Sequence, residues 1–145
     1  MKKKLIFTIV LIALCMGGCK PREYQFPNKG RAIESIELLY NQDEGYTENP
    51  FTSIRMLETN EIELFMSELY TLQTYHPTPP PRNFGPYIAI VTYEGGDREV
   101  FSSYHIEFVE YGNEICGVGG YHFEQDAFDE LFMEYAEKAE DGSTS

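Results

Sequence analysis

A proline-rich segment divides this chain into two parts. Residues 75 to 86 read "YHPTPPPRNFGP" and contain five prolines. Proline lacks a backbone N–H and fixes φ near about −65°, so neither a helix nor a central strand can run through such a segment. Elements on its amino-terminal side must end there, and new elements must begin after it.

The residues before the prolines predict two strands and a helix. Residues 33–40 alternate between apolar and polar side chains, which indicates a strand with one buried face, and residues 54–57 predict a second short strand. In residues 60–73 the apolar side chains fall at helical spacing and glutamates lie opposite them. Asn60 followed by Glu63 resembles a capping box, so we expect the helix to begin at Asn60.

The residues after the prolines predict several strands and a final helix. Residues 87–121 are rich in β-branched and aromatic side chains. Gly95 and Gly96 suit a two-residue hairpin turn, and Gly112 with Asn113 suggests another. Alternation from Tyr104 to Phe108 predicts a strand between these turns. An apolar stripe from Phe128 to Ala139 predicts the second helix.

The first twenty residues, "MKKKLIFTIVLIALCMGGCK", have the form of an export signal. Three lysines precede an apolar run of about a dozen residues, well short of the roughly 20 that a membrane span needs. Gly17 and Gly18 directly precede Cys19, and this sequence resembles the lipobox of bacterial lipoproteins, although Met16 stands where Leu is usual. An uncleaved anchor and an ordinary secreted protein are the alternatives.

The lipobox resemblance implies a processing step and a location. Residues 1–18 would be the signal peptide, and Cys19 would carry a diacylglycerol and further acyl chains such as palmitate. The protein would then be held in the cell membrane on its extracytoplasmic side. Cys15 would leave with the signal peptide, so Cys116 would be the one unmodified cysteine and no disulfide could form within the mature chain.

The mature chain is long enough for one domain. It has 127 residues, with 8 basic and 24 acidic side chains, and its net charge of −16 excludes a nucleic-acid-binding role. We expect residues 19–31 to be the lipidated cysteine and a tether, residues 32–140 to be the domain, and residues 141–145 to be a disordered tail.

The order of the elements predicts an α+β fold. Strand, helix, three or four strands and helix, in the order β-α-β-β-β-α, pack most economically as an antiparallel sheet of four to five strands with both helices on one face. This order resembles the small ectodomains of uncharacterised Gram-positive bacterial lipoproteins, some of which have TATA-box-binding-protein-like folds. That resemblance covers roughly residues 33–138 and implies no known activity.

The best candidate for a metal site combines His105, Glu107, Cys116 and His122. Zinc prefers imidazole and thiolate ligands, and pairing of neighbouring strands would bring these residues together. The alternative, which we favour, is a solvent-facing histidine and glutamate beside a small buried thiol. We therefore expect no metal and no other cofactor.

Catalytic motifs are weak throughout the chain. Cys116 is flanked by Glu110 and Glu114, and negative charge raises the pKa of a thiol, which argues against a cysteine nucleophile. "CGVGGY", residues 116–121, lacks the Lys and the Ser or Thr of a phosphate-binding loop. Among 24 acids no carboxylate pair stands out.

The proline segment is the best candidate for an interaction surface. Residues 77–81 suit either an extended recognition segment or a stiff connector. Tyr75, Phe84 and Tyr87 border the prolines, and tyrosine is favoured at interfaces. We expect Tyr87 to be partly buried and Phe84 to be exposed, so Phe84 and Tyr75 form the predicted surface.

The sequence thus predicts a membrane-anchored extracytoplasmic lipoprotein. Its domain would bind a protein or another envelope component and catalyse no reaction. A cell-envelope hydrolase with an unrecognised carboxylate site and a sensor of divalent metal ions are the alternative hypotheses.

Overall fold

The computed structural model describes residues 23–42, 51–76, 84–106, 108–111, 114–117, 120–124 and 126–138. The strands are β1 (Ile33–Asn41), β2 (Phe51–Met56), β3 (Thr74–Tyr75), β4 (Tyr87–Tyr93), β5 (Arg98–Ser102), β6 (Phe108–Tyr111), β7 (Glu114–Gly117) and β8 (His122–Phe123). The helices are α2 (Thr59–Leu69) and α3 (Ala127–Glu137). The prediction of an α+β fold with an antiparallel sheet and two helices is confirmed.

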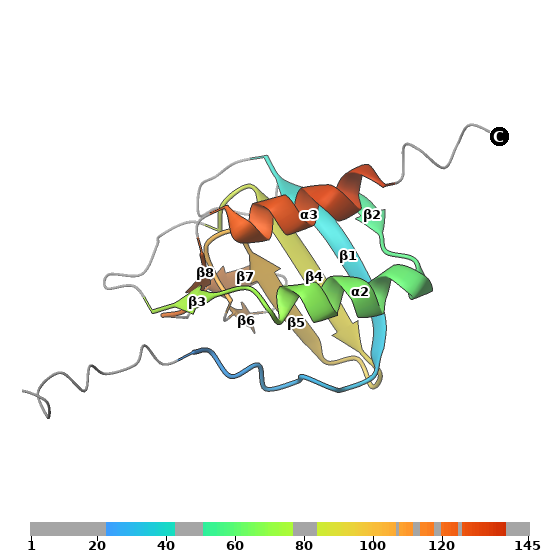
Figure 1. Cartoon of the computed structure of the whole chain (residues 1–145), viewed down its shortest axis with the longest axis horizontal. Helices are drawn as coiled ribbons and strands as arrows, with labels where there is room; N and C mark the ends of the chain where they lie inside the picture. Colours follow the sequence, from blue (N-terminus) through green and yellow to red (C-terminus); the bar gives the residue numbers. More distant parts are fainter. Residues whose placement is uncertain are drawn as a thin grey trace, which may run out of the picture.

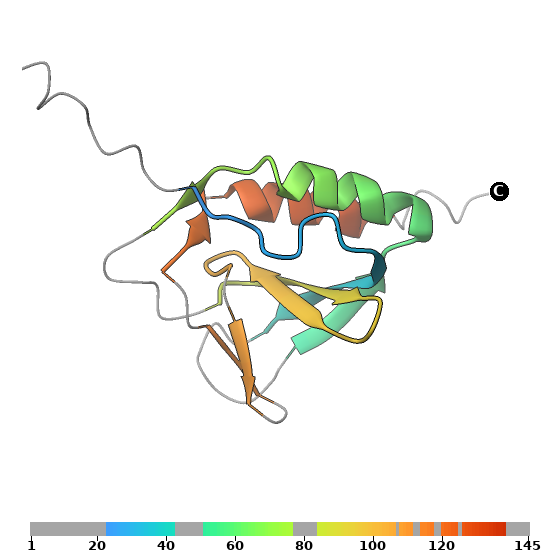
Figure 2. The ribbon, with the colours of Figure 1, turned by 90° about the horizontal axis from the view of Figure 1, so that it is seen from below.

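The described part of the chain forms a helical layer on a sheet. The main sheet has four antiparallel strands in the order β2-β1-β4-β5, and both helices lie on one of its faces (Figure 1). The β6–β7 hairpin lies on the opposite side of the sheet from the helices (Figure 2). A short ribbon of β3 and β8 forms beside one end of the helical layer.

The main core lies between the helices and the sheet. Its buried side chains come from both layers and include Ile36, Leu38, Ala89, Val91, Phe101, Phe65, Leu69, Phe128, Phe132 and Tyr135. A second apolar cluster of Leu39, Ile88, Ile90 and Val100 lies apart from it. Because side chains alternate along a strand, these four point to the other face of the sheet. The central strand β4 is therefore apolar on both faces.

Arg55 ties the edge of the sheet to both helices. It lies on β2, and its guanidinium donates hydrogen bonds to the Glu61 carboxylate and to the Tyr135 carbonyl, the latter at 2.7 Å. Glu61 also accepts a hydrogen bond from the backbone N–H of Glu58 at 2.9 Å. The half-buried carboxylate of Glu61 thus caps α2 and neutralises Arg55, the only cation of β2.

The predicted start of the first helix is within one residue of the observed one, but its predicted capping pair and its predicted end were wrong. The helix begins with Glu58 and Glu61 as its capping pair, two residues before the predicted pair of Asn60 and Glu63. It ends at Leu69 and not at residue 73. The chain leaves the helix early because Thr74 and Tyr75 must reach β8, where they pair with Phe123 and His122.

One predicted turn is confirmed and one predicted strand is wrong. Gly95 and Gly96 have φ of 101° and 89° in the turn that joins β4 to β5. The strand predicted from Tyr104 to Phe108 does not form, because the chain bends after Ser102, whose backbone N–H donates to the His105 carbonyl at 2.9 Å. The second predicted turn, at residues 112 and 113, lies outside the described part. The residues on either side of it, Tyr111 and Glu114, pair with each other in the β6–β7 hairpin.

The predicted tether is also corrected. Residues 23–31, called the strap below, are packed against the domain and are not a free linker. Tyr24 and Phe26 are half-buried against the main core, and exposed residues alternate with them. The folded unit therefore begins no later than Glu23.

Candidate functional site

The strap closes the open side of the molecule between the helices and β5 (Figure 2). The ring of Phe26 contacts three other rings, those of Tyr70 at 4.9 Å, Phe101 at 6.2 Å and Phe123 at 6.5 Å. The backbone N–H of Tyr24 donates to Thr74 Oγ1 at 3.0 Å. An apolar anchor and a backbone hydrogen bond thus fix the strap in place.

Two cations of the strap lie over buried phenol rings. Lys29 Nζ is 5.1 Å from the centre of the Tyr70 ring, and the Arg31 guanidinium is 4.8 Å from that of Tyr93. Such contacts contribute about 0.5–1 kcal/mol at exposed positions. Arg31 also forms an ion pair with Asp97 at 2.8 Å. Lys29 forms no ion pair with the residues that the structure describes.

Beneath the strap, two tyrosines and a glutamate interact electrostatically. The Tyr93 hydroxyl donates to the Glu99 carboxylate, and Tyr70 interacts with both of these residues. Burial raises the pKa of both phenols, and the hydrogen bond to Glu99 raises that of Tyr93 further. Both tyrosines therefore stay protonated at physiological pH, which makes them structural donors and not bases.

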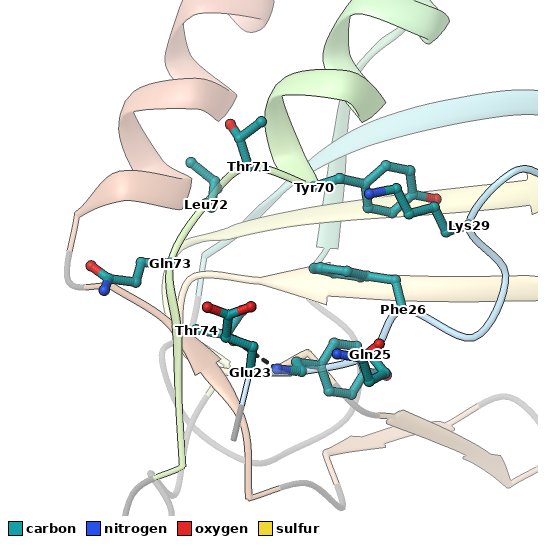
Figure 3. Close-up of a pocket in the computed structure, with 10 residues that line it drawn as sticks. Glu23, Gln25, Phe26, Lys29, Tyr70, Thr71, Leu72, Gln73 and Thr74 are labelled. Carbon is teal, nitrogen blue, oxygen red and sulfur yellow. Dashed lines mark hydrogen bonds between the residues drawn. The ribbon is translucent and has the colours of Figure 1, made fainter. Parts of the chain in front are cut away.

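A cavity of about 460 Å³ lies between the strap and the segment that follows α2 (Figure 3). Residues 23–26 and Lys29 line it on one side and residues 70–74 on the other. Its lining mixes the rings of Phe26 and Tyr70 with the polar side chains of Glu23 and Gln73. A cavity of this size can hold a small ligand or the head of a larger one.

An aromatic patch adjoins this cavity on the β3–β8 ribbon. We define the patch as Tyr24, Tyr75, His76, Tyr121 and His122. Its rings contact one another in pairs: Tyr75 and His122 at 5.9 Å, His76 and Tyr121 at 5.0 Å, Tyr24 and Tyr121 at 5.2 Å. Tyr75 is 37% exposed, and His76 is also exposed. Tyr24 belongs to both the patch and the cavity lining.

Gly120 makes the patch possible. A Cβ at this position would come within 2.2 Å of His76 Nε2, so only glycine lets the imidazole lie over the backbone there. This glycine is part of the "CGVGGY" sequence that lacks phosphate-binding partners. Its close contact with His76 gives it a structural role.

The residues predicted to form an interaction surface lie in different places. Tyr75 is in the aromatic patch, and its hydroxyl donates to Gln73 Oε1 at 3.1 Å. Phe84 is half-buried against the second apolar cluster, with its ring 6.3 Å from that of Phe51, so the expectation that it is exposed was wrong. Tyr87 is half-buried and stacks on Phe132 at 4.7 Å. Residues 77–83 lie outside the described part.

The proposed metal ligands are only partly described. His105 is 5% exposed, so the expectation of a solvent-facing histidine was wrong. The Ile106 backbone N–H donates to the Tyr121 carbonyl at 3.2 Å. The backbone next to His105 therefore lies beside the backbone next to His122. Glu107 and the side chain of Cys116 lie outside the described part, as does Cys19. Among the described residues no three His, Cys, Asp or Glu side chains group as metal ligands.

Sequence reasoning missed one unusual carboxyl group, that of Asp129 in the first turn of α3. Its Oδ1 is buried without a hydrogen-bond partner in the described structure. Burial raises the pKa of this carboxyl, a hydrogen bond from Ser103 opposes that effect, and the charge of Asp126 adds to it. No feature of the sequence distinguishes Asp129 from the other acids of this helix, because its burial follows from tertiary packing alone.

Within the described residues no helix is both long enough and apolar enough to cross a bilayer. The chain matches no protein-family model, no curated protein and no solved structure.

Proposed function

We propose that this protein is a lipid-anchored extracytoplasmic binding or accessory domain that catalyses no reaction of its own. The lipobox-like sequence supports the anchor at Cys19. Two or more acyl chains on one cysteine give stable attachment, whereas a single chain gives only reversible binding. The aromatic patch and the cavity beside it supply a surface suited to contact with a partner.

The packed strap is the observation that supports this proposal most strongly. It begins at Glu23, four residues after Cys19, and it is fixed by Phe26 and by the hydrogen bond to Thr74. Four extended residues span at most about 14 Å. A lipid on Cys19 would hold the domain directly at the membrane surface, as suits an accessory protein that acts there.

The alternative hypotheses gain no comparable support. An envelope hydrolase would need two carboxyl groups facing a common substrate site. Asp129, the one acid among the described residues whose pKa is raised, lies at the start of α3 and is not among the residues that line the cavity. A metal sensor would need a set of ligands, and the described residues offer none.

The anchor is tested by two cysteine variants of the full chain in a bacterial host. Cys19→Ala should abolish incorporation of an alkyne-labelled fatty acid and leave the protein uncleaved or released without lipid, because only the thiol can take the diacylglycerol. Cys15→Ala is the matched control, since this cysteine lies four residues away within the signal. It should be labelled and processed like the unchanged protein. Labelling of the Cys19→Ala protein at the original mature mass would overturn the proposal.

A further inference from the structure

Positive and negative charges are separated along the mature chain. Residues 20–31 contain four of its eight basic side chains and one acid, for a net charge of +3. Residues 32–145 contain the other four basic side chains and 23 acids, for a net charge of −19. The most positive segment of the mature chain thus directly follows the cysteine that would carry the lipid.

Residues 23–31 of this segment, the strap, lie against one side of the fold. Lys29 is exposed over the Tyr70 ring and forms no ion pair with the described residues. Arg31 is neutralised by Asp97, so Lys29 is the strap cation best placed to meet an external anion. Lys20 and Arg22 precede the strap in the sequence and add two further charges near the anchor.

Aromatic side chains lie next to the amino-terminal end of the strap, the end that follows Lys20 and Arg22 in the sequence. Tyr24 contacts Tyr121, and through the β3–β8 ribbon the patch continues to the exposed ring of Tyr75. Tyrosine is enriched where proteins meet the headgroup layer, because its ring is apolar and its hydroxyl is polar. Basic side chains next to a membrane are attracted by anionic lipids over the same short range.

We propose that the strap and the aromatic patch seat the domain on the headgroup layer of an anionic phospholipid bilayer, with the acidic remainder facing away. This inference rests on the proposed lipid anchor, which keeps Glu23 within about 14 Å of the lipidated residue. Electrostatic attraction and repulsion fall off over about 8 Å at physiological ionic strength. The segment nearest the bilayer therefore determines the orientation, and it is the positive one.

The absence of tryptophan from the chain permits a direct test with a single introduced reporter. Tyr75→Trp places the reporter in the patch. Met56→Trp is the matched control, because Met56 is 51% exposed on β2, at the opposite edge of the main sheet from β5 and the strap. Each lipidated full-length variant is reconstituted in vesicles of phosphatidylcholine with phosphatidylglycerol, and quenching by brominated lipid is measured.

We expect tryptophan at position 75 to be quenched at least about twofold more than tryptophan at position 56. Adding Lys29→Gln to the Tyr75→Trp protein should reduce that excess on anionic vesicles and leave quenching unchanged on vesicles of phosphatidylcholine alone. Equal quenching at the two positions would overturn the proposed orientation. If the Lys29→Gln change leaves the excess quenching at position 75 unaltered on anionic vesicles, the orientation does not depend on the charge of Lys29, and its proposed electrostatic basis is wrong.

The mass of the vesicle-bound protein separates this inference from the proposed anchor. A protein that carries diacylglycerol but shows equal quenching overturns the orientation alone. A protein without diacylglycerol overturns the proposed function, and the inference falls with it.

Discussion

Asp129 is a half-buried carboxyl whose charge disfavours the folded state. Burial raises its pKa above the ordinary value of 3.8, so the folded protein binds this proton more tightly than the unfolded chain does. The contribution of Asp129 to the free energy of unfolding is therefore greatest at low pH and is lost as pH rises through the raised pKa. The unpartnered Oδ1 adds a desolvation cost when the group is ionised.

Replacing Asp129 by asparagine removes this pH dependence. We expect Asp129→Asn to gain more stability relative to the unchanged protein at pH 7 than at pH 3.5, as measured by urea denaturation at both values. Glu130→Gln is the matched control, because Glu130 is an exposed acid in the same helical turn. The difference in free energy of unfolding between Asp129→Asn and the unchanged protein should depend on pH. If it is the same at both pH values, the pKa of Asp129 is not raised in the folded protein.

The strap is an element without regular secondary structure, and its stability contribution rests on one ring. Phe26 is half-buried among three other aromatic rings, so Phe26→Ala should lower the free energy of unfolding by about 2–3 kcal/mol. Gln25→Ala, at an exposed neighbouring position, should change it by less than about 0.5 kcal/mol. If the two variants have equal free energies of unfolding in chemical denaturation, residues 23–31 are a loose tether and not a packed part of the domain.

Local signals in the sequence were enough for the helices, the hairpin at Gly95 and Gly96, and the α+β class. Periodicity and turn chemistry depend on residues a few positions apart, and both helices bury their apolar stripes as expected. The strap was missed because its contacts are distant in sequence, as between Tyr24 and Thr74, fifty residues apart. Nothing within residues 23–31 themselves predicts that hydrogen bond.

The candidate site was predicted only in part for the same reason. Tyr75 was selected because it borders the prolines, but most of its neighbours in the patch come from distant parts of the chain, namely Tyr24 of the strap, Tyr121 and His122. Strands of two residues, such as β3 and β8, have no measurable period. The patch therefore becomes visible only when Tyr75 is seen opposite His122 and Gly120 is seen beneath His76.

The whole molecule carries far more negative than positive charge. Residues 19–145 have a net charge of −16, and the described structure offers only a few ion pairs to offset it, among them the exposed pair of Arg31 and Asp97. Exposed pairs contribute about 0–1 kcal/mol each. Repulsion among like charges destabilises a compact state, so the net electrostatic effect on folding should be unfavourable at low ionic strength.

Screening by salt should therefore stabilise the folded domain. Raising a monovalent salt from about 0.01 M to about 1 M shortens the Debye length from about 30 Å to about 3 Å, which weakens repulsion between distant acids more than contacts such as that of Arg55 with Glu61. We expect the Tm to rise over this range in circular dichroism melts, equally for sodium chloride and choline chloride. A rise with sodium alone would indicate specific ion binding, and a fall in both salts would show that attractive pairs outweigh the repulsion expected from the sequence.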